Sequence, residues 1–214
     1  MKLRIALISI AMAAATALSG CASVGMPGIG TQIALNADAK LTPRDRQMLA
    51  LAPAEEWQIP IVRRRVPDPT GEPPGTIVID TTVKNLYFVL PGRQAIQYKV
   101  ATGAESYGWT GRATVGQMQE WPRWMPTASL MEKWPEFKVY LQHGPLAGAY
   151  DNPLGARALY LGNTDYRIHG TNLPETIGQA ISSGCFRLVN DDVIDLFDRV
   201  SVGTRVIIKQ AAQL

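Results

Sequence analysis

The chain has 214 residues, of which 46% are hydrophobic. This length suits one sizeable globular domain with extensions and argues against a second full domain. The 21 Lys and Arg residues against 18 Asp and Glu residues give a formal charge of only +3. Such a weak charge does not indicate a nucleic-acid-binding protein.

Residues 1–20 have the pattern of an export signal. Lys2 and Arg4 precede an apolar run, residues 5–18, that is too short for an ordinary membrane span. The sequence Leu-Ser-Gly-Cys at residues 18–21 resembles the lipobox of bacterial lipoproteins. We therefore expect lipid on Cys21 and a periplasmic protein anchored to a membrane. Ala22, where inner-membrane retention uses Asp, favours the outer membrane; ordinary signal cleavage at the small residues 11–17 is the alternative.

Removal of the signal takes away Lys2 and Arg4, which leaves 19 basic and 18 acidic residues and a charge of +1. The chain has two cysteines, Cys21 and Cys185. A disulfide between them is one possibility in an exported protein. If Cys21 is acylated, that disulfide cannot form, and the sequence around Cys185 favours a reactive nucleophile.

Residues 21–74 are rich in proline and are predicted to form a tether. Within them, Thr42 can cap a short helix that has Pro43 at its first position and extends to Leu51. The basic cluster of residues 63–65 is predicted to be solvated linker charge, with contact to anionic lipid or cell-wall polymer as the alternative.

Residues 75–214 are predicted to form a mainly β domain. Apolar, β-branched and aromatic runs predict strands at 76–80, 86–90, 94–101, 158–161, 165–169 and 204–209. Asn190 is predicted to cap a helix over 191–199, with Asp191 and Asp192 at its positive end.

An aromatic-rich stretch lies in the middle of this domain. Its residues are Tyr107, Trp109, Trp121, Trp124 and Trp134. Part of it is expected in the core, and part, Trp124 above all, in the wall of a groove for an extended peptide. His143 is predicted to lie in an exposed loop, and two histidines without an acidic or thiol cluster predict no zinc site.

The stretch 168–190 holds the chemistry. His169 is expected at a strand end, and Cys185 follows the small residues Ser182, Ser183 and Gly184. A nearby imidazole lowers the pKa of a thiol and accepts its proton, so the pair predicts a nucleophile and its base. The backbone N–H groups of Cys185 and Gly184 are the expected donors to an oxyanion.

Arg187 is two residues after the thiol, so strand alternation predicts that both side chains share one face. The guanidinium can bind a substrate carboxylate, or it can pair with Asp191 or Asp192. The sequence favours neither substrate binding nor the ion pair.

The motif His169-Gly170-Thr171-Asn172, followed after twelve intervening residues by Ser182-x-Gly184-Cys185-Phe186-Arg187-Leu188, resembles the signature of the L,D-transpeptidase catalytic domain (YkuD-type, ErfK-like). The resemblance implies a β-sandwich of mixed sheets with a short helix after the catalytic loop. It also implies that Cys185 is the nucleophile, that His169 is the base, and that a backbone carbonyl at Gly170 or Thr171 orients the imidazole. Ser182, Ser183, Trp124 and Arg187 are then expected beside the substrate. Many family members carry a second histidine at the position of Ser183.

The same resemblance implies an activity. Cys185 would attack the bond between the third and fourth residues of a peptidoglycan tetrapeptide stem, expel D-Ala and form a thioester, with no cofactor or metal. The acceptor would be a diaminopimelate amine, an amine of an outer-membrane protein, or water, and the enzyme would be a carbapenem target. A non-catalytic wall-binding lipoprotein is the alternative from another class, and an exported thiol oxidoreductase is disfavoured because no Cys-x-x-Cys occurs.

Overall fold

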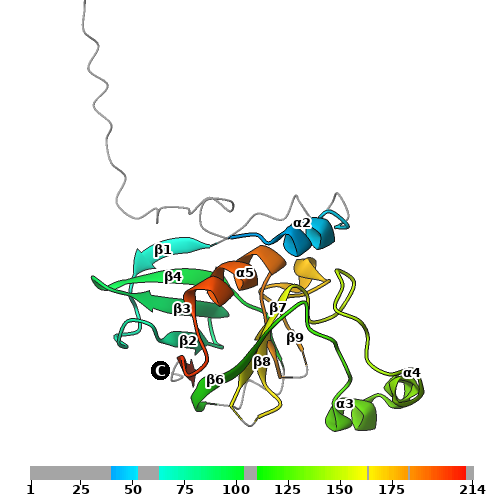
Figure 1. Cartoon of the computed structure of the whole chain (residues 1–214). Coiled ribbons are helices and arrows are strands. Elements are labelled where there is room, and N and C mark those ends of the chain that lie inside the picture. Colours follow the sequence, from blue (N-terminus) through cyan, green and yellow to red (C-terminus); the bar gives the residue numbers. More distant parts are fainter. Residues whose placement is uncertain (1–39, 53–62, 104–109, 163, 183, 211–214) are drawn as a thin grey trace, which may run out of the picture.

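The computed structural model describes residues 40–52, 63–103, 110–162, 164–182 and 184–210 (Figure 1). The predicted export signal, Cys21, Tyr107, Trp109 and Ser183 lie outside these residues. Within the described residues, no helix has both the length and the apolar character needed to cross a membrane.

Eleven strands form most of the regular structure in the described part of the chain, in agreement with the predicted mainly β class. They are β1 (Arg64–Pro67), β2 (Ile77–Asp80), β3 (Asn85–Leu90), β4 (Gln94–Lys99), β5 (Thr102–Gly103), β6 (Gly111–Glu120), β7 (Arg157–Leu161), β8 (Arg167–His169), β9 (Ala180–Ser182), β10 (Phe186–Arg187) and β11 (Arg205–Lys209). The helices are α2 (Pro43–Leu49), α3 (Ala128–Lys133), α4 (Tyr140–His143) and α5 (Asn190–Arg199), with 3-10 turns η3 (Pro135–Val139) and η4 (Pro174–Thr176).

One curled mixed sheet carries the fold. Its strand order is β1-β4-β3-β2-β11-β6-β7-β8-β10, with β5 and β9 paired separately. The long strand β6 joins the two halves, because its first part pairs with β11 and its second part pairs with β7. The pairs β11–β2 and β10–β8 are parallel. The predicted mixed sheets are thus two halves of one sheet that share a strand.

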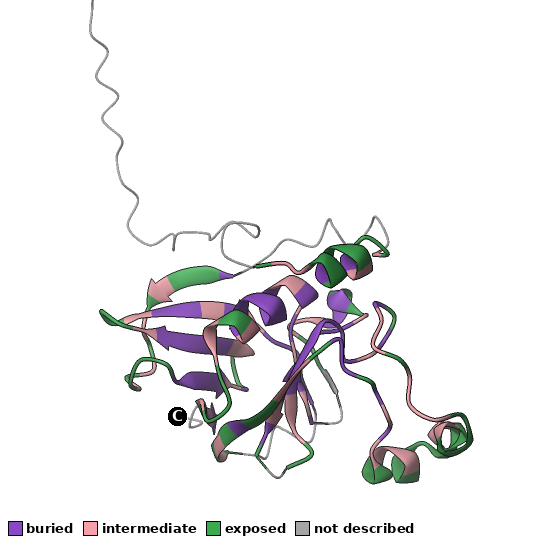
Figure 2. Ribbon diagram, viewed as in Figure 1, coloured by how far each residue is buried: buried purple, intermediate pink, exposed green. Residues whose placement is uncertain are grey.

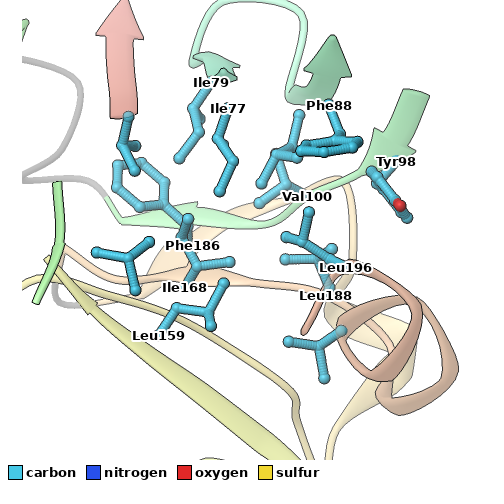
Figure 3. Packing of buried hydrophobic residues seen from close by; sticks show 14 of the residues in the cluster. Ile77, Ile79, Phe88, Tyr98, Val100, Leu159, Ile168, Phe186, Leu188 and Leu196 are labelled. Carbon is cyan, nitrogen blue, oxygen red and sulfur yellow. The ribbon is translucent and has the colours of Figure 1, made fainter. Parts of the chain in front are cut away.

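The hydrophobic core lies between these halves. Ile77 and Ile79 of β2 face Ile168 of β8 and Phe186 of β10 across the core (Figure 3), and all four are fully buried. Burial of each such side chain stabilises the fold by about 1.5–3 kcal/mol. Because Ile168 and Phe186 immediately adjoin His169 and Cys185, the core anchors both residues from the inner face of the strands.

Helix α5 differs from the prediction at its first residue. The helix includes Asn190, its N-cap residue is Val189, and no side chain caps it. The predicted capping role of Asn190 is therefore wrong. Its amide is buried and bonds instead to the backbone of Ala156 and Thr171, groups that water cannot reach.

The described parts of the predicted tether pack on the domain. The predicted helix is present as α2, capped by a reciprocal pair of hydrogen bonds between Thr42 and Asp45. Leu49 of α2 packs with Trp121 and with Ile194 of α5, and Figure 1 shows α2 beside α5. Strand β1 adds to the edge of β4. The folded unit therefore begins before residue 75.

The basic cluster at 63–65 is only partly solvated. Arg64 and Arg65 are exposed, but Arg63 is 0% exposed and pairs with Asp195 at 3.3 Å and Asp192 at 3.8 Å (Figure 2 shows the buried face of α5). The prediction of linker charge is wrong for Arg63. A buried guanidinium is tolerated there because two carboxylates of α5 compensate it.

Candidate active site

Three neighbouring strands bring the predicted residues onto one face. His169 of β8 is opposite Ala158 of β7 and opposite Arg187 of β10. Two residues along, Arg167 is opposite Tyr160. Side chains two residues apart in a strand point to the same side, so Arg167 accompanies His169 and Cys185 accompanies Arg187. All four line one groove.

His169 is held as a neutral base. Its Nδ1 atom is 2.6 Å from the carbonyl oxygen of Gly170, and a carbonyl oxygen can only accept. Nδ1 therefore carries the proton and Nε2 keeps its lone pair. Burial and, to a smaller extent, the Arg187 guanidinium lower the pKa of His169, the Gly170 hydrogen bond opposes them, and the net result is a pKa of about 3. The backbone carbonyl that was expected to orient the imidazole is thus that of Gly170.

Cys185 differs from the prediction in its protonation. Burial raises the pKa of the Cys185 thiol, and the Arg167 guanidinium is the strongest opposing influence. The thiol is 3.9 Å from the carbonyl oxygen of Asp165. The expected lowering of the thiol pKa by the imidazole is not found, because a neutral imidazole has no charge with which to stabilise a thiolate. The resting site therefore holds a thiol and a neutral imidazole that line the same groove.

Gly184, immediately before the thiol, cannot readily be replaced. Its φ of +119° is a left-handed conformation, and a Cβ atom there would lie 2.7 Å from Cε1 of Tyr166. The backbone at Gly184 therefore lies directly against Cε1 of the Tyr166 ring. The role of the Gly184 and Cys185 N–H groups toward an oxyanion stays a prediction.

Asn190 of α5 fixes the turn that follows His169. Its Oδ1 accepts hydrogen bonds from the N–H groups of Ala156 at 2.9 Å and Thr171 at 3.3 Å, and its Nδ2 donates to Thr171 O at 3.0 Å. A Cβ atom at Gly170 would lie 2.3 Å from the same Oδ1. The glycine lets the amide approach the turn closely, and the amide in turn determines where Gly170 O points.

Strand β10 is held on both of its edges. On one edge it pairs with β8, and on the other the N–H and C=O groups of Arg187 both bond to Ala101 at 2.9 Å. This double pairing positions Arg187 and, through it, the adjoining Cys185. Asp192 is occupied by Arg63, so the alternative in which Arg187 pairs with this carboxylate is not found.

An aromatic segment forms the other wall of the groove, whose volume is about 760 Å³. The segment comprises α3, η3 and α4 and projects from the body of the domain (Figure 1). Trp124 lies at its base, with ring centroids 5.3 Å from Tyr140 and 5.9 Å from Phe137 in edge-on contacts. This volume is within the range of small-molecule and peptide sites.

The other predicted residues are distributed as follows. Trp121 is in the core, where its indole donates to Asp45, and His143 is exposed at the end of α4. Ser182 ends β9, with its backbone opposite Gly103, and Ser183 lies outside the described residues. Among the described residues, no group of His, Cys, Asp and Glu could hold a metal ion.

Several residues that line the groove were not predicted from the sequence, among them Asp165, Tyr166 and Arg167. The alternation of Arg167 and His169 within one strand was a usable signal for Arg167. Nothing in the sequence pairs Tyr166 with Gly184, since that contact depends on the approach of two loops.

Comparison with known proteins identifies the family of this chain. The L,D-transpeptidase catalytic domain (YkuD) family model matches residues 74–208. The Escherichia coli protein named "Probable L,D-transpeptidase ErfK/SrfK" is 36% identical over 139 residues, which cover 61% of this chain and 42% of that relative. This chain thus spans less than half of its length.

Two solved structures are also similar. One, named "Probable carnitine operon oxidoreductase caia" from Brucella melitensis, is 40% identical with a TM-score of 0.47 and covers 73% of this chain and all of that one. An L,D-transpeptidase from Mycobacterium smegmatis is 17% identical with a TM-score of 0.48 and covers 63% of this chain and 58% of that one. Because the family model matches more than half of its residues, the chain belongs to the L,D-transpeptidase catalytic domain family.

Proposed function

We propose that this protein is a cysteine-dependent L,D-transpeptidase that acts on peptidoglycan stem tetrapeptides. The observation that carries the proposal is the hydrogen bond from His169 Nδ1 to Gly170 O, which leaves Nε2 as a base on the face shared with Cys185. The family to which the chain belongs supports the reaction class.

The first half-reaction forms a thioester. As Sγ of Cys185 attacks the carbonyl carbon before the terminal D-Ala, His169 Nε2 takes the thiol proton. The N–H groups of Cys185 and Gly184 stabilise the oxyanion. The imidazolium, which burial disfavours, then returns its proton to the leaving amine, and the C–N bond breaks to release D-Ala.

The second half-reaction transfers the acyl group. An amine enters the groove, loses a proton to His169 and attacks the thioester, and the thiol is regenerated. A diaminopimelate amine gives a 3→3 cross-link, an amine of an outer-membrane protein gives a wall-anchored protein, and water gives a tripeptide. The aromatic wall formed by Trp124, Phe137 and Tyr140 suits an extended peptide.

Acylation by a carbapenem tests the nucleophile. In the chain with Cys21→Ala, Cys185 is the only thiol, so mass spectrometry should find one carbapenem per protein. The same chain with Cys185→Ala should gain none. With disaccharide-tetrapeptide, dimer formation indicates cross-linking and tripeptide alone indicates hydrolysis. A folded protein that forms no adduct and consumes no tetrapeptide would instead be a non-catalytic wall-binding protein.

The proposed location is the periplasm, with lipid on Cys21 anchoring the protein to the outer membrane. The motif at residues 18–21 supports this proposal. Replacement of Cys21 by Ala should move the exported protein from the membrane fraction to the soluble periplasmic fraction. A parent protein that is already fully soluble after export would exclude the anchor.

A further inference from the structure

Two half-buried arginines in the groove, Arg167 and Arg187, differ from three other arginines in their ion pairs. Arg63, Arg157 and Arg199 each pair with an aspartate. Among the described residues, Arg167 and Arg187 form no ion pair. The Nε atom of each is buried without a hydrogen-bond partner, as is that of Arg157, so the missing counter-charge is what sets the two groove arginines apart. A partly desolvated cation normally has a compensating anion nearby, and a buried donor atom without a partner requires an explanation.

The protein holds the guanidinium of Arg167 and the backbone of Arg187. The guanidinium of Arg167 is stacked 5.3 Å over the ring of Tyr160, whose hydroxyl donates to Gln119 at 2.9 Å. The backbone of Arg187 is fixed on both edges of β10. Arg167 therefore presents its donors to the groove with little loss of conformational freedom on binding, and Arg187 lines the groove from a fixed strand position.

The two cations flank the reacting residues. Arg187 is opposite His169 across the β8–β10 pair, and Arg167 is the strongest influence that opposes the raised pKa of Cys185. Burial lowers the pKa of Arg187 itself, as expected for a desolvated cation without a counter-charge. An anion bound between them would therefore lie within reach of the scissile bond.

The acids of the groove do not supply this anion. Glu136, Asp151 and Asp165 also line it, but none forms an ion pair with Arg167 or Arg187 among the described residues. Asp165 is close enough to Cys185 to raise the pKa of the thiol, so it adds to the need for the nearby cations. The planar fork of a guanidinium matches a carboxylate in two parallel hydrogen bonds.

We propose that Arg167 and Arg187 together form a carboxylate-binding subsite that holds the donor stem peptide beside Cys185. The inference rests on the proposed function, since a stem tetrapeptide carries carboxylates next to the bond that is cut. Two sources have this chemistry: the C-terminal carboxylate of the leaving D-Ala and the side-chain carboxylate of diaminopimelate. Blocking each carboxylate in turn as an amide distinguishes the two sources.

Binding of a carboxylate here also affects the base. Arg187 and Arg167 both lower the pKa of His169, and a bound carboxylate offsets their charge. The imidazole then becomes a stronger base at the moment the donor arrives. The subsite thereby links recognition of a free carboxylate to activation of the nucleophile.

The test measures binding without turnover. In the full chain with Cys21→Ala and Cys185→Ala, titration calorimetry gives the Kd for disaccharide-tetrapeptide, for its C-terminal amide and for its diaminopimelate side-chain amide. Arg167→Gln and Arg187→Gln are compared with Arg205→Gln, an exposed arginine of β11 outside the groove. Melting temperatures confirm that each variant is folded.

We expect Arg167→Gln to weaken binding of the tetrapeptide about tenfold to a hundredfold, the effect of one charge-assisted contact. Arg167→Gln should have little effect on binding of the amide derivative in which the recognised carboxylate is blocked. The derivative that is insensitive to Arg167→Gln therefore shows which of the two carboxylates the subsite binds. Arg167→Lys should retain part of the affinity, and Arg205→Gln should match the parent.

The inference is overturned if Arg167→Gln and Arg205→Gln bind the tetrapeptide alike, or if Arg167→Gln weakens the tetrapeptide and both amides equally. The carbapenem adduct separates this failure from failure of the proposed function. A protein that acylates at Cys185 and turns over tetrapeptide but shows either result keeps its function and loses this subsite. A protein that forms no adduct at Cys185 and does not turn over tetrapeptide has neither the proposed function nor this subsite.

Discussion

Asp45 and Arg157, 112 residues apart in the chain, form a buried bidentate ion pair in which both Nη atoms of Arg157 are 2.7 Å from carboxylate oxygens of Asp45. Asp45 also accepts a hydrogen bond from the indole of Trp121 at 2.8 Å. The carbonyl oxygen of Arg157 in turn accepts the N–H of Gly170 at 3.0 Å. Helix α2, which precedes the matched family residues 74–208, thus contacts the strand that supports the turn after His169.

Replacement of Asp45 by Asn should lower the free energy of unfolding by about 3–5 kcal/mol, because it leaves the Arg157 guanidinium buried without a counter-charge. Urea denaturation measures the loss. Glu132→Gln, on the exposed surface of α3, is the control and should be within about 0.5 kcal/mol of the parent.

The same variant has a predictable pH dependence. Burial raises the pKa of Asp45, but hydrogen bonds from Arg157 and Thr42 outweigh it, and the pKa falls to about 2. Because the folded pKa is below the unfolded value, the stabilisation is present above about pH 4 and is lost as pH falls through 2. The difference in the free energy of unfolding between the parent and Asp45→Asn should become smaller over this range. A difference that does not change with pH would contradict the ion pair.

Asn190→Ala should impair acylation by more than its effect on stability explains. The substitution leaves the N–H groups of Ala156 and Thr171 without their acceptor, which costs about 1–3 kcal/mol for each buried group. It also releases the Gly170 carbonyl that orients His169. The rate of carbapenem acylation should fall about tenfold or more in protein that is still folded by circular dichroism.

Asn172→Ala is the matched control for Asn190→Ala. The amide of Asn172 also bonds to a backbone carbonyl, that of Asp151 at 2.9 Å, but it does not touch the Gly170 turn. Equal rates for the two variants would show that Asn190 has no positioning role.

Gly184→Ala should be damaging for two separate reasons, the φ of +119° and the contact with Tyr166. Gly203 has a φ of +94° with nothing within 4 Å of a Cβ atom. Gly203→Ala therefore reports the conformational strain alone, about 1–2 kcal/mol. Gly184→Ala should be the more destabilising variant and should slow acylation about a hundredfold.

The double variant Gly184→Ala with Tyr166→Ala isolates the contact. Removal of the ring should restore part of the stability that Gly184→Ala loses, measured as a coupling energy between the two sites. The absence of a coupling energy would mean that Gly184 does not lie against the Tyr166 ring.

The pH dependence of acylation tests the protonation of the pair. Because the pKa of His169 is lowered to about 3, the imidazole is already neutral at pH 5, and the acylation rate should be level between about pH 5 and 8. In His169→Ala the rate should be about 10²- to 10⁴-fold lower and should rise with pH as thiolate forms. An inflection near pH 6.5 in the parent would contradict the lowered pKa, and Ser183→Ala should behave as the parent does.

The sequence by itself was sufficient for the local elements. Alternating apolar residues predicted the strands around Ile77 and Ile168, and Thr42 with Pro43 predicted the start of α2. These features depend on neighbours within a few residues, so a linear pattern contains them. The spacing of His169 and Cys185 likewise indicated two strand ends that meet.

Only the tertiary structure decided which buried polar groups become partners. The position of Asn190 before a helix predicted a capping role. Instead, the backbone of Ala156 and Thr171 lies close enough to form hydrogen bonds with its amide. Arg63 is buried because α5 brings two carboxylates over it. Arg167 and Arg187 have no such carboxylate. Desolvation and cross-strand register determine each of these outcomes, and both arise from segments that are far apart in the chain.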